Sequence, residues 1–294
     1  MTENGRGAAL MCGSMAAFTL NDACLKWLAA DMPTFQVVVL RGLATLLFLY
    51  ALARLTGAWA KPVPRGEWPK VLLRSGAEVC AFLPFVLALT RMPLADITAI
   101  LQAIPLAITA TAALVLGERV GPRRWAAIGL GLAGVLLIVR PGAEGWSWWT
   151  ALPVVTVLVI VVRDLVTRRL SPEVPSLKVA MVTAAGITGL GAVLSLREPW
   201  AGVGAGQGAV IVLCGAFILG GYLFSVMAMR VGEVAVVTPF RYTAMIWGLL
   251  LGWLVFGEWP DGVASAGAAL VVAAGLYTLW REARVPMPRP AAPR

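Results

Sequence analysis

The sequence contains no histidine, which excludes imidazole proton relays and histidine metal sites. Charged residues are also scarce, at 13% of 294 residues, whereas a soluble domain carries about 25%. The four cysteines lie in apolar segments without the spacing of a metal site or a disulfide framework, so we expect them to be buried and reduced. We therefore expect no metal, no cofactor and no catalytic residue.

Hydrophobic residues make up 60% of the chain and gather in long continuous runs. A helix needs about 20 largely apolar residues to cross a bilayer. The runs lack the alternation of barrel strands. The sequence predicts an all-α integral membrane protein with ten spanning segments, at 8–29, 34–55, 69–90, 94–116, 123–139, 147–169, 176–196, 207–229, 234–256 and 261–280.

The net charge of +9 is spread over short loops and the C-terminal tail, which argues against a nucleic-acid partner and for the lipid bilayer. Lys and Arg concentrate in the N-terminus, the even-numbered loops and the C-terminus. The opposite side holds only Lys26, Arg91, Arg140 and Arg197. Because basic loops stay in the cytoplasm, we expect both termini there.

The two halves of the chain repeat each other. A shift of 142 aligns Asp22 with Asp164 and Lys26 with Arg168, and a shift of 140 aligns Gly117-Glu118 with Gly257-Glu258. Five spans per repeat is an odd number, so the second half must start from the other side of the membrane. We expect two inverted five-helix repeats, over 1–141 and 142–282, and a disordered cytoplasmic tail over 283–294.

These halves resemble the ten-helix EamA-type members of the drug/metabolite transporter superfamily. The resemblance rests on "LGER" (Leu116–Arg119) and "FGEW" (Phe256–Trp259), which close the fourth and ninth segments, and on the small-residue segments that follow them. It implies proton- or gradient-coupled movement of small metabolites, often amino acids and usually exported from bacteria, and so a place in the bacterial inner membrane. It also implies that segments 5 and 10 are peripheral and that segments 1, 3, 4, 6, 8 and 9 surround a cavity.

Charged residues inside the spans are the first candidates for function, because each costs about 2.5–3.5 kcal/mol to insert. Glu78 could contact a substrate ammonium or carry a coupling proton, or it could pair structurally with Arg74, four residues earlier. Arg241 could hold a substrate carboxylate. Arg41 and Arg163 lie nearer the segment ends, where snorkelling to headgroups would explain them.

Two repeated acid–base pairs are candidate gates: Asp22 with Lys26, and Asp164 with Arg168. Both follow the favourable helical order of acid before base at four-residue spacing. Topology places the first near the outer end and the second near the inner end. They could close the two ends in turn, each gate being closed when its charges pair across to another helix, or they could simply anchor the helix ends.

The fourth and ninth segments carry matched polar pairs, Thr98 with Gln102 and Thr238 with Tyr242. Four-residue spacing puts each pair on one helix face, where it could line a cavity or bond a neighbouring helix. Phe82 and Tyr222 could stack on a substrate or pack the bundle. Prolines inside four segments predict kinks, at Pro84, Pro105, Pro153 and Pro239.

The leading hypothesis is a secondary transporter of small polar or zwitterionic metabolites that works by alternating access, with amino-acid export as the first guess. Uptake of a vitamin or nucleoside-like metabolite is the alternative within this class. A membrane-embedded lipid-modifying enzyme is the alternative outside it, although no acid-rich metal motif or Ser/Lys pair supports one. Small residues in segments 5 and 10 predict close packing or a homodimer.

Overall fold

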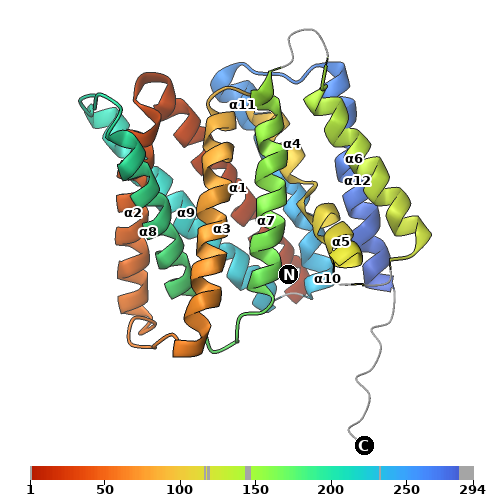
Figure 1. The fold of residues 1–294 in the computed structure, drawn as a ribbon, viewed down its shortest axis with the longest axis horizontal. Coiled ribbons are helices and arrows are strands. Elements are labelled where there is room, and N and C mark those ends of the chain that lie inside the picture. The colour runs from red at the N-terminus through yellow and green to blue at the C-terminus, as the bar shows by residue number, and fades with distance from the viewer. Residues whose placement is uncertain (1, 116, 118–119, 143–146, 232, 285–294) are drawn as a thin grey trace, which may run out of the picture.

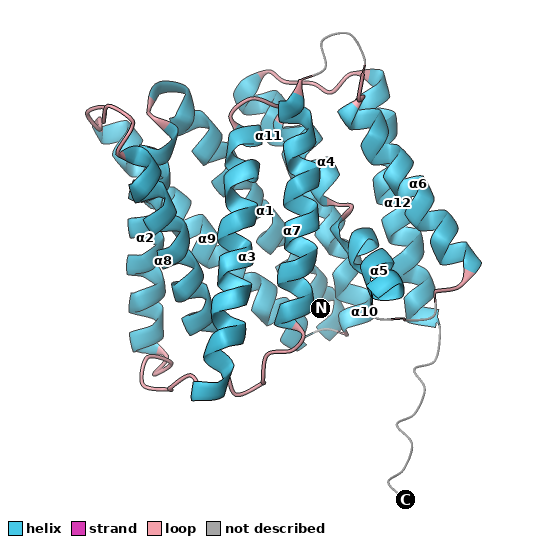
Figure 2. Cartoon of the chain, viewed as in Figure 1, coloured by secondary structure: helices cyan, strands magenta, loops and turns pink. Residues whose placement is uncertain are grey.

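The computed structural model describes residues 2–115, 117, 120–142, 147–231 and 233–284, and the elements in these ranges are helical (Figure 2). The first half comprises α1 (Glu3–Asp31), α2 (Thr34–Leu55), η1 (Arg65–Glu67), α3 (Trp68–Leu89), α4 (Leu94–Leu101), α5 (Ile104–Val115) and α6 (Pro122–Val139). The second comprises η2 (Trp148–Ala151), α7 (Leu152–Thr167), α8 (Ser176–Ser195), α9 (Ala205–Val231), α10 (Val234–Val237), η3 (Thr238–Tyr242), α11 (Thr243–Phe256) and α12 (Gly262–Arg284).

Ten of these helical stretches are long and apolar enough to cross a membrane, which confirms the expected fold class. Their ends agree with the sequence spans to within a few residues, except that α1 begins five residues earlier and α12 ends four residues later. The start of α1 and the last turn of α12 lie at the same end of the bundle, called here the terminal end (Figure 1). The remainder of the predicted tail, 285–294, and most of the "LGER" motif lie outside the described residues.

The fourth and ninth spans are each broken into shorter helices. In the fourth span α4 ends at Leu101 and α5 starts at Ile104, so that Pro105 occupies the first turn of a new helix. In the ninth, Pro239 lies in the 3₁₀ segment η3 between α10 and α11. The other two prolines do not break a span, because α3 continues through Pro84 and Pro153 lies at the start of α7. The expected interruption at Pro153 is therefore wrong.

The helix contacts repeat between the two halves. The α1–α9 contact has its counterpart in α7–α3, and the α2–α9 contact in α8–α3. Two further contacts pair a helix with its own equivalent: α2 with α8 at one edge of the bundle, and α6 with α12 at the other (Figure 1). This is the arrangement that two inverted repeats require.

The α6–α12 contact depends on glycine. A Cβ on Gly134 would lie 2.6 Å from the Gly267 carbonyl oxygen, and a Cβ on Gly267 would lie 2.6 Å from the Gly134 carbonyl oxygen. Ala268 is buried on the same side of α12, whereas Gly129 and Ala133 face outward on α6. These small residues of α12 thus pack against α6 of the same chain, and small residues are typical of closely packed membrane helices.

The cysteines are less buried than the sequence suggested. All four are free thiols, but only Cys214 is fully buried, and Cys80 is exposed on α3. Apolar surface on a spanning helix faces lipid rather than water, so exposure here carries no solubility cost.

Candidate functional site

A cavity of about 780 Å³ lies between the two halves, within the size range of small-molecule sites. Its lining comes mostly from α1, α2, α3, α7, α8 and α9, with Arg241 from η3 and Leu101 from α4. Segments 2 and 7 (α2 and α8) therefore line the cavity in addition to the six segments that the resemblance implied. None of the described lining residues belongs to α6 or α12.

The cavity extends to the terminal end of the bundle. Its lining there includes four residues after the last turn of α7, in the connection to α8: Leu170, Ser171, Pro172 and Val174. Among the described lining residues, none comes from a loop at the opposite end. The structure is therefore accessible from the terminal end and closed at the other.

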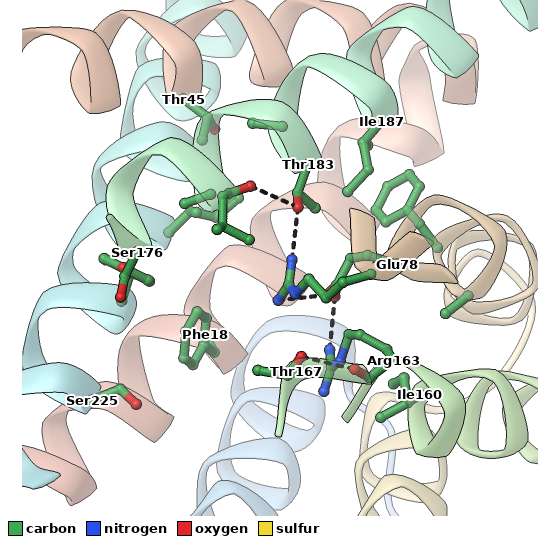
Figure 3. Close-up of a pocket in the computed structure, with 18 of the residues that line it drawn as sticks. Phe18, Thr45, Glu78, Ile160, Arg163, Thr167, Ser176, Thr183, Ile187 and Ser225 are labelled. Carbon is green, nitrogen blue, oxygen red and sulfur yellow. Dashed lines mark hydrogen bonds and ion pairs between the residues drawn. The ribbon is translucent and has the colours of Figure 1, made fainter. Parts of the chain in front are cut away.

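Glu78 on α3 lies in an ion-pair cluster that crosses the cavity wall (Figure 3). Its Oε2 is 3.0 Å from Nη2 of Arg74, and its Oε1 accepts a hydrogen bond of 2.8 Å from Nη1 of Arg163 on α7. Arg74 Nη1 also donates to Thr183 Oγ1 on α8 at 2.7 Å. The structural pair with Arg74 is present, and Arg163 faces the cavity instead of snorkelling to a helix end.

Asp164 is bonded to its neighbour in the chain rather than to Arg168. Its Oδ1 accepts from Nε of Arg163 at 2.7 Å, while Arg168 is exposed at the C-terminal cap of α7. The expected Asp164–Arg168 side-chain pair is therefore wrong, because Asp164 points along the helix toward the guanidinium that also binds Glu78. Arg241 lines the same cavity from η3.

A second polar cluster lies on α1 and α2. Arg41 Nη1 donates to Asn21 Oδ1 at 3.1 Å, and Asn21 Nδ2 donates to Asp22 Oδ1 at 2.9 Å. All three residues line the cavity. Arg41 is 5% exposed, so the expectation that it snorkels to the interface is wrong.

The two clusters occupy related positions in the two repeats. The shift of 142 residues that aligns Asp22 with Asp164 also aligns Asn21 with Arg163 and Arg41 with Thr183. The first repeat thus presents Asp22 and Arg41 to the cavity, whereas the second presents Arg163 and Thr183, and Asp164 is not among the described lining residues. The chemistry of the two sites differs, since one holds a guanidinium where the other holds a hydroxyl.

Lys26 does not pair with Asp22 within α1, but its charge pairs across to another segment, as the gate hypothesis expects of a closed end. Its Nζ lies 2.6 Å from Oε1 of Glu258, and it donates to the Met92 carbonyl at 2.7 Å. Glu258 Oε2 accepts from the backbone N–H of Leu94, at the start of α4. These contacts join α1, α4 and the end of α11 where the cavity is closed. They are called here the outer latch, because the sequence predicts that this end faces outward.

Further contacts hold the same end together. Arg140, at the end of α6, pairs with Asp261, just before α12. Asp261 also accepts from the backbone N–H groups of Ala264 and Val263, and these bonds together with Arg140 hold the pKa of its carboxyl below the ordinary value.

The polar pairs of the fourth and ninth segments lie beside the cavity rather than in its lining. Thr98 packs on α11, where a Cβ at Gly248 would lie 2.8 Å from its Oγ1. Gln102 Nε2 donates to the Arg241 carbonyl at 3.2 Å, so the gap between α4 and α5 is bonded to η3. Tyr242 is buried against Gly275 of α12, and Thr238 is half-buried in η3. Bonding and packing between helices account for Thr98, Gln102 and Tyr242.

Phe82 and Tyr222 do line the cavity, from α3 and α9. The Arg41 guanidinium carbon lies 5.2 Å from the centroid of the Phe82 ring. Sequence reasoning did not place Arg41, Asn21 or Thr183 in the site. The shift of 142 residues that relates the repeats was the signal that could have located them.

The EamA-like transporter family is matched over residues 5–140. Over 293 residues the chain is 31% identical to a riboflavin transporter of Rhizobium johnstonii, an alignment that covers 95% of this chain and 92% of that protein. It is 26% identical to the pseudopaline exporter of Pseudomonas aeruginosa, covering 88% and 92%. It is 20% identical to an S-adenosylmethionine uptake transporter of Rickettsia prowazekii, covering 92% and 90%.

A crystal structure with 20% sequence identity superposes with a TM-score of 0.61, covering 94% of this chain and 99% of that one, which shows a shared fold. The named relatives are transporters of small metabolites and not enzymes. With its ten spanning helices, its central cavity and this full-length similarity, the chain belongs to the EamA-like transporter family of the drug/metabolite transporter superfamily and is a multi-pass membrane transporter of small metabolites.

Proposed function

We propose that this protein takes up riboflavin, or a closely related planar heteroaromatic vitamin, by alternating access. The observation that carries the proposal is the 31% identity over 95% of the chain to the riboflavin transporter of Rhizobium johnstonii. A riboflavin transporter of Vibrio cholerae is also 31% identical, over 62% of this chain. Vitamin uptake, the sequence alternative, thus has more support than amino-acid export.

The chemistry of the cavity supports a planar aromatic substrate. Phe18, Phe82, Phe85 and Tyr222 line it together with four arginines and the carboxylates of Asp22 and Glu78. Aromatic rings and guanidinium planes offer stacking surfaces to a conjugated ring system. Hydroxyl groups of Thr45, Thr156 and Thr167 would suit a polyol chain.

The proposed cycle uses the two ends of the cavity in turn, across a bacterial inner membrane with both termini in the cytoplasm. The outer latch closes the outer end in the state described here. Opening that end requires Lys26 to leave Glu258, while the terminal end closes around Asp164 and Arg168. Glu78 would hold Arg74 and Arg163 in the cavity wall and could carry the coupling proton, and Arg241 would contact substrate from η3.

Amino-acid export is the competing hypothesis. The similarity to a pseudopaline exporter supports outward transport. An excess of arginines around few acids also suits a zwitterion. The two hypotheses differ in which compound competes for transport and in the direction of net flux.

The experiment is uptake into a riboflavin-auxotrophic bacterium that has no riboflavin transporter of its own. Cells expressing this protein should accumulate riboflavin saturably, grow on low riboflavin, and show no competition from an excess of mixed amino acids. Changing the pH gradient across the membrane tests whether uptake is coupled to protons. If the protein fails to support growth, and purified protein in proteoliposomes exchanges amino acids but not riboflavin, the proposal is wrong.

A further inference from the structure

Arg41 is the most buried charged side chain that lines the cavity. It is 5% exposed, and Asn21 fixes one end of its guanidinium through the 3.1 Å bond to Nη1. The Phe82 ring lies 5.2 Å from its Cζ, so an aromatic face supports the guanidinium. The side chain is therefore held in one place by groups from α1 and α3.

The Nε–H of Arg41 has no hydrogen-bond partner among the described residues, although the atom is buried. An unsatisfied buried donor costs about 1–3 kcal/mol, and more when the group is charged. Such a cost is rarely kept in a structure without a role. A donor held rigidly at a cavity wall is suited to an acceptor on a bound ligand.

Arg74 Nε is also buried without a partner among the described residues, but Arg74 and Arg163 each bind a carboxylate. Arg163 binds both Glu78 and Asp164, and Arg74 binds Glu78 and Thr183. Among the described ion pairs none involves Arg41, whose nearest acid, Asp22, is reached only through Asn21. Among the described residues of the two clusters, Arg41 is therefore the guanidinium that no carboxylate pairs with directly.

Asp22 adds an acceptor beside this donor. It lines the cavity and is half-buried, and its Oδ1 accepts the 2.9 Å bond from Asn21. A carboxylate has about four acceptor positions, so further positions remain for a ligand N–H. Arg41 and Asp22 thus present a donor and an acceptor that are both bonded to Asn21.

We propose that Arg41, Asn21, Asp22 and Phe82 form a subsite for the imide edge of a planar heteroaromatic ring, in which a carbonyl oxygen lies next to a ring N–H. The Arg41 guanidinium donates to the carbonyl oxygen, and the Asp22 carboxylate accepts from the ring N–H. The isoalloxazine ring of riboflavin carries such an edge at its N3 position. This inference rests on the proposed function and specifies which part of the substrate is recognised.

The first test needs no variant. Full-length protein is purified into lipid nanodiscs, and binding of riboflavin is compared with binding of 3-methylriboflavin, whose N3 carries a methyl group in place of the proton. We expect the methylated compound to bind at least about tenfold more weakly, because it removes the donor to Asp22 and leaves a buried acceptor unpaired. Equal binding of the two compounds would overturn the subsite.

Variants then locate the recognition. Arg41→Lys keeps the charge but loses the planar fork, so riboflavin binding should weaken about tenfold. Asp22→Leu removes the acceptor, and the preference for riboflavin over 3-methylriboflavin should fall to less than about threefold. The matched control is Arg91→Lys, because Arg91 also stacks on an aromatic ring, 3.7 Å from Trp149, but does not line the cavity.

The outcomes separate the two proposals. A wild-type protein that binds no riboflavin contradicts the proposed function and this subsite together. A wild-type protein that binds riboflavin, while Arg41→Lys and Arg91→Lys both bind it as well as wild type does, contradicts the subsite and leaves the proposed function standing. Size-exclusion profiles in matching buffers show whether each variant is folded.

Discussion

Glu78 shares its two carboxylate oxygens between guanidiniums on different helices, Arg74 on α3 and Arg163 on α7. All three side chains are less than a quarter exposed, so the charges are only partly hydrated. Removing the Glu78 carboxylate would leave the two guanidiniums facing each other without the acid between them, which costs more than an ion pair itself contributes. Glu78 therefore fixes the shape of the cavity wall as well as its charge.

Glu78→Gln should reduce riboflavin uptake at least tenfold and destabilise the protein by about 1–3 kcal/mol, since Gln cannot neutralise two arginines. If Glu78 carries the coupling proton, the remaining flux will no longer respond to a pH gradient. Uptake assays and thermal unfolding measure the two effects, and Glu173→Gln in the exposed α7–α8 loop is the control. Wild-type uptake by Glu78→Gln would remove Glu78 from the mechanism.

The sequence identified Glu78, Phe82, Tyr222, Arg241 and Asp22 as polar or aromatic residues at membrane depth, and the structure places all of them in the cavity lining. It could not give their partners. Lys26 bonds Glu258, 232 residues away, and four-residue spacing says nothing about contacts at that range. Nor could it show that Arg41 faces inward, because the same position on a rotated helix would meet headgroups.

At the scale of single elements, the two broken spans meet near the cavity. The gap between α4 and α5 contains Gln102, which bonds the Arg241 carbonyl in η3. Broken helices at corresponding places in two repeats are typical of transporter binding sites, because unwound backbone is tolerated only beside a cavity or inside protein. Proline explains each break, but its presence alone did not predict which spans would break, since α3 continues through Pro84.

The α6–α12 contact should be intolerant of any added side chain. Gly134→Ala would place a methyl group against the Gly267 carbonyl, and a rigid backbone cannot move aside as a side chain can. We expect a loss of about 1–3 kcal/mol, seen as a lower apparent unfolding temperature. Gly129→Ala on the same helix has nothing within 4 Å and should not destabilise the protein. Equal effects of the two changes would mean that α6 and α12 do not pack this way.

The outer latch should behave as a coupled unit. Lys26→Met and Glu258→Gln should each lower the apparent unfolding temperature, and the double variant should be no less stable than either single one, because each change already breaks the pair. The control is Lys70→Met, which removes a more exposed cation from its pair with Glu67 and should have little effect. Additive losses for Lys26 and Glu258 would show that the latch does not form.

At the scale of the whole molecule, two halves of related sequence enclose one cavity and contact each other symmetrically. This much could be predicted, since an odd number of spans per repeat fixes the inversion. Which end of the cavity is closed could not be predicted. The two states of an alternating-access cycle have the same sequence and differ in which end is held together by ion pairs and hydrogen bonds. In the structure the outer latch is formed, and the lining reaches the terminal end.

The homodimer expected through segments 5 and 10 remains a prediction at this scale. Within the chain, α6 and α12 already pack against each other at Gly134 and Gly267. Segment 5 could contribute to a dimer through the outward face of α6, where Gly129 and Ala133 lie. Cross-linking of Ala133→Cys in membranes would give a disulfide dimer if that face is the interface, and only monomer if it is not.

The most direct test of the account is the accessibility of cysteines placed at positions 22 and 164 in a cysteine-free background. Each is labelled by a membrane-impermeant maleimide applied from either side, with and without riboflavin. Because the two positions are equivalent in inverted repeats, riboflavin should change their labelling from a given side in opposite senses, as one end closes while the other opens. Labelling that rises or falls together at both positions would contradict alternation between the two ends.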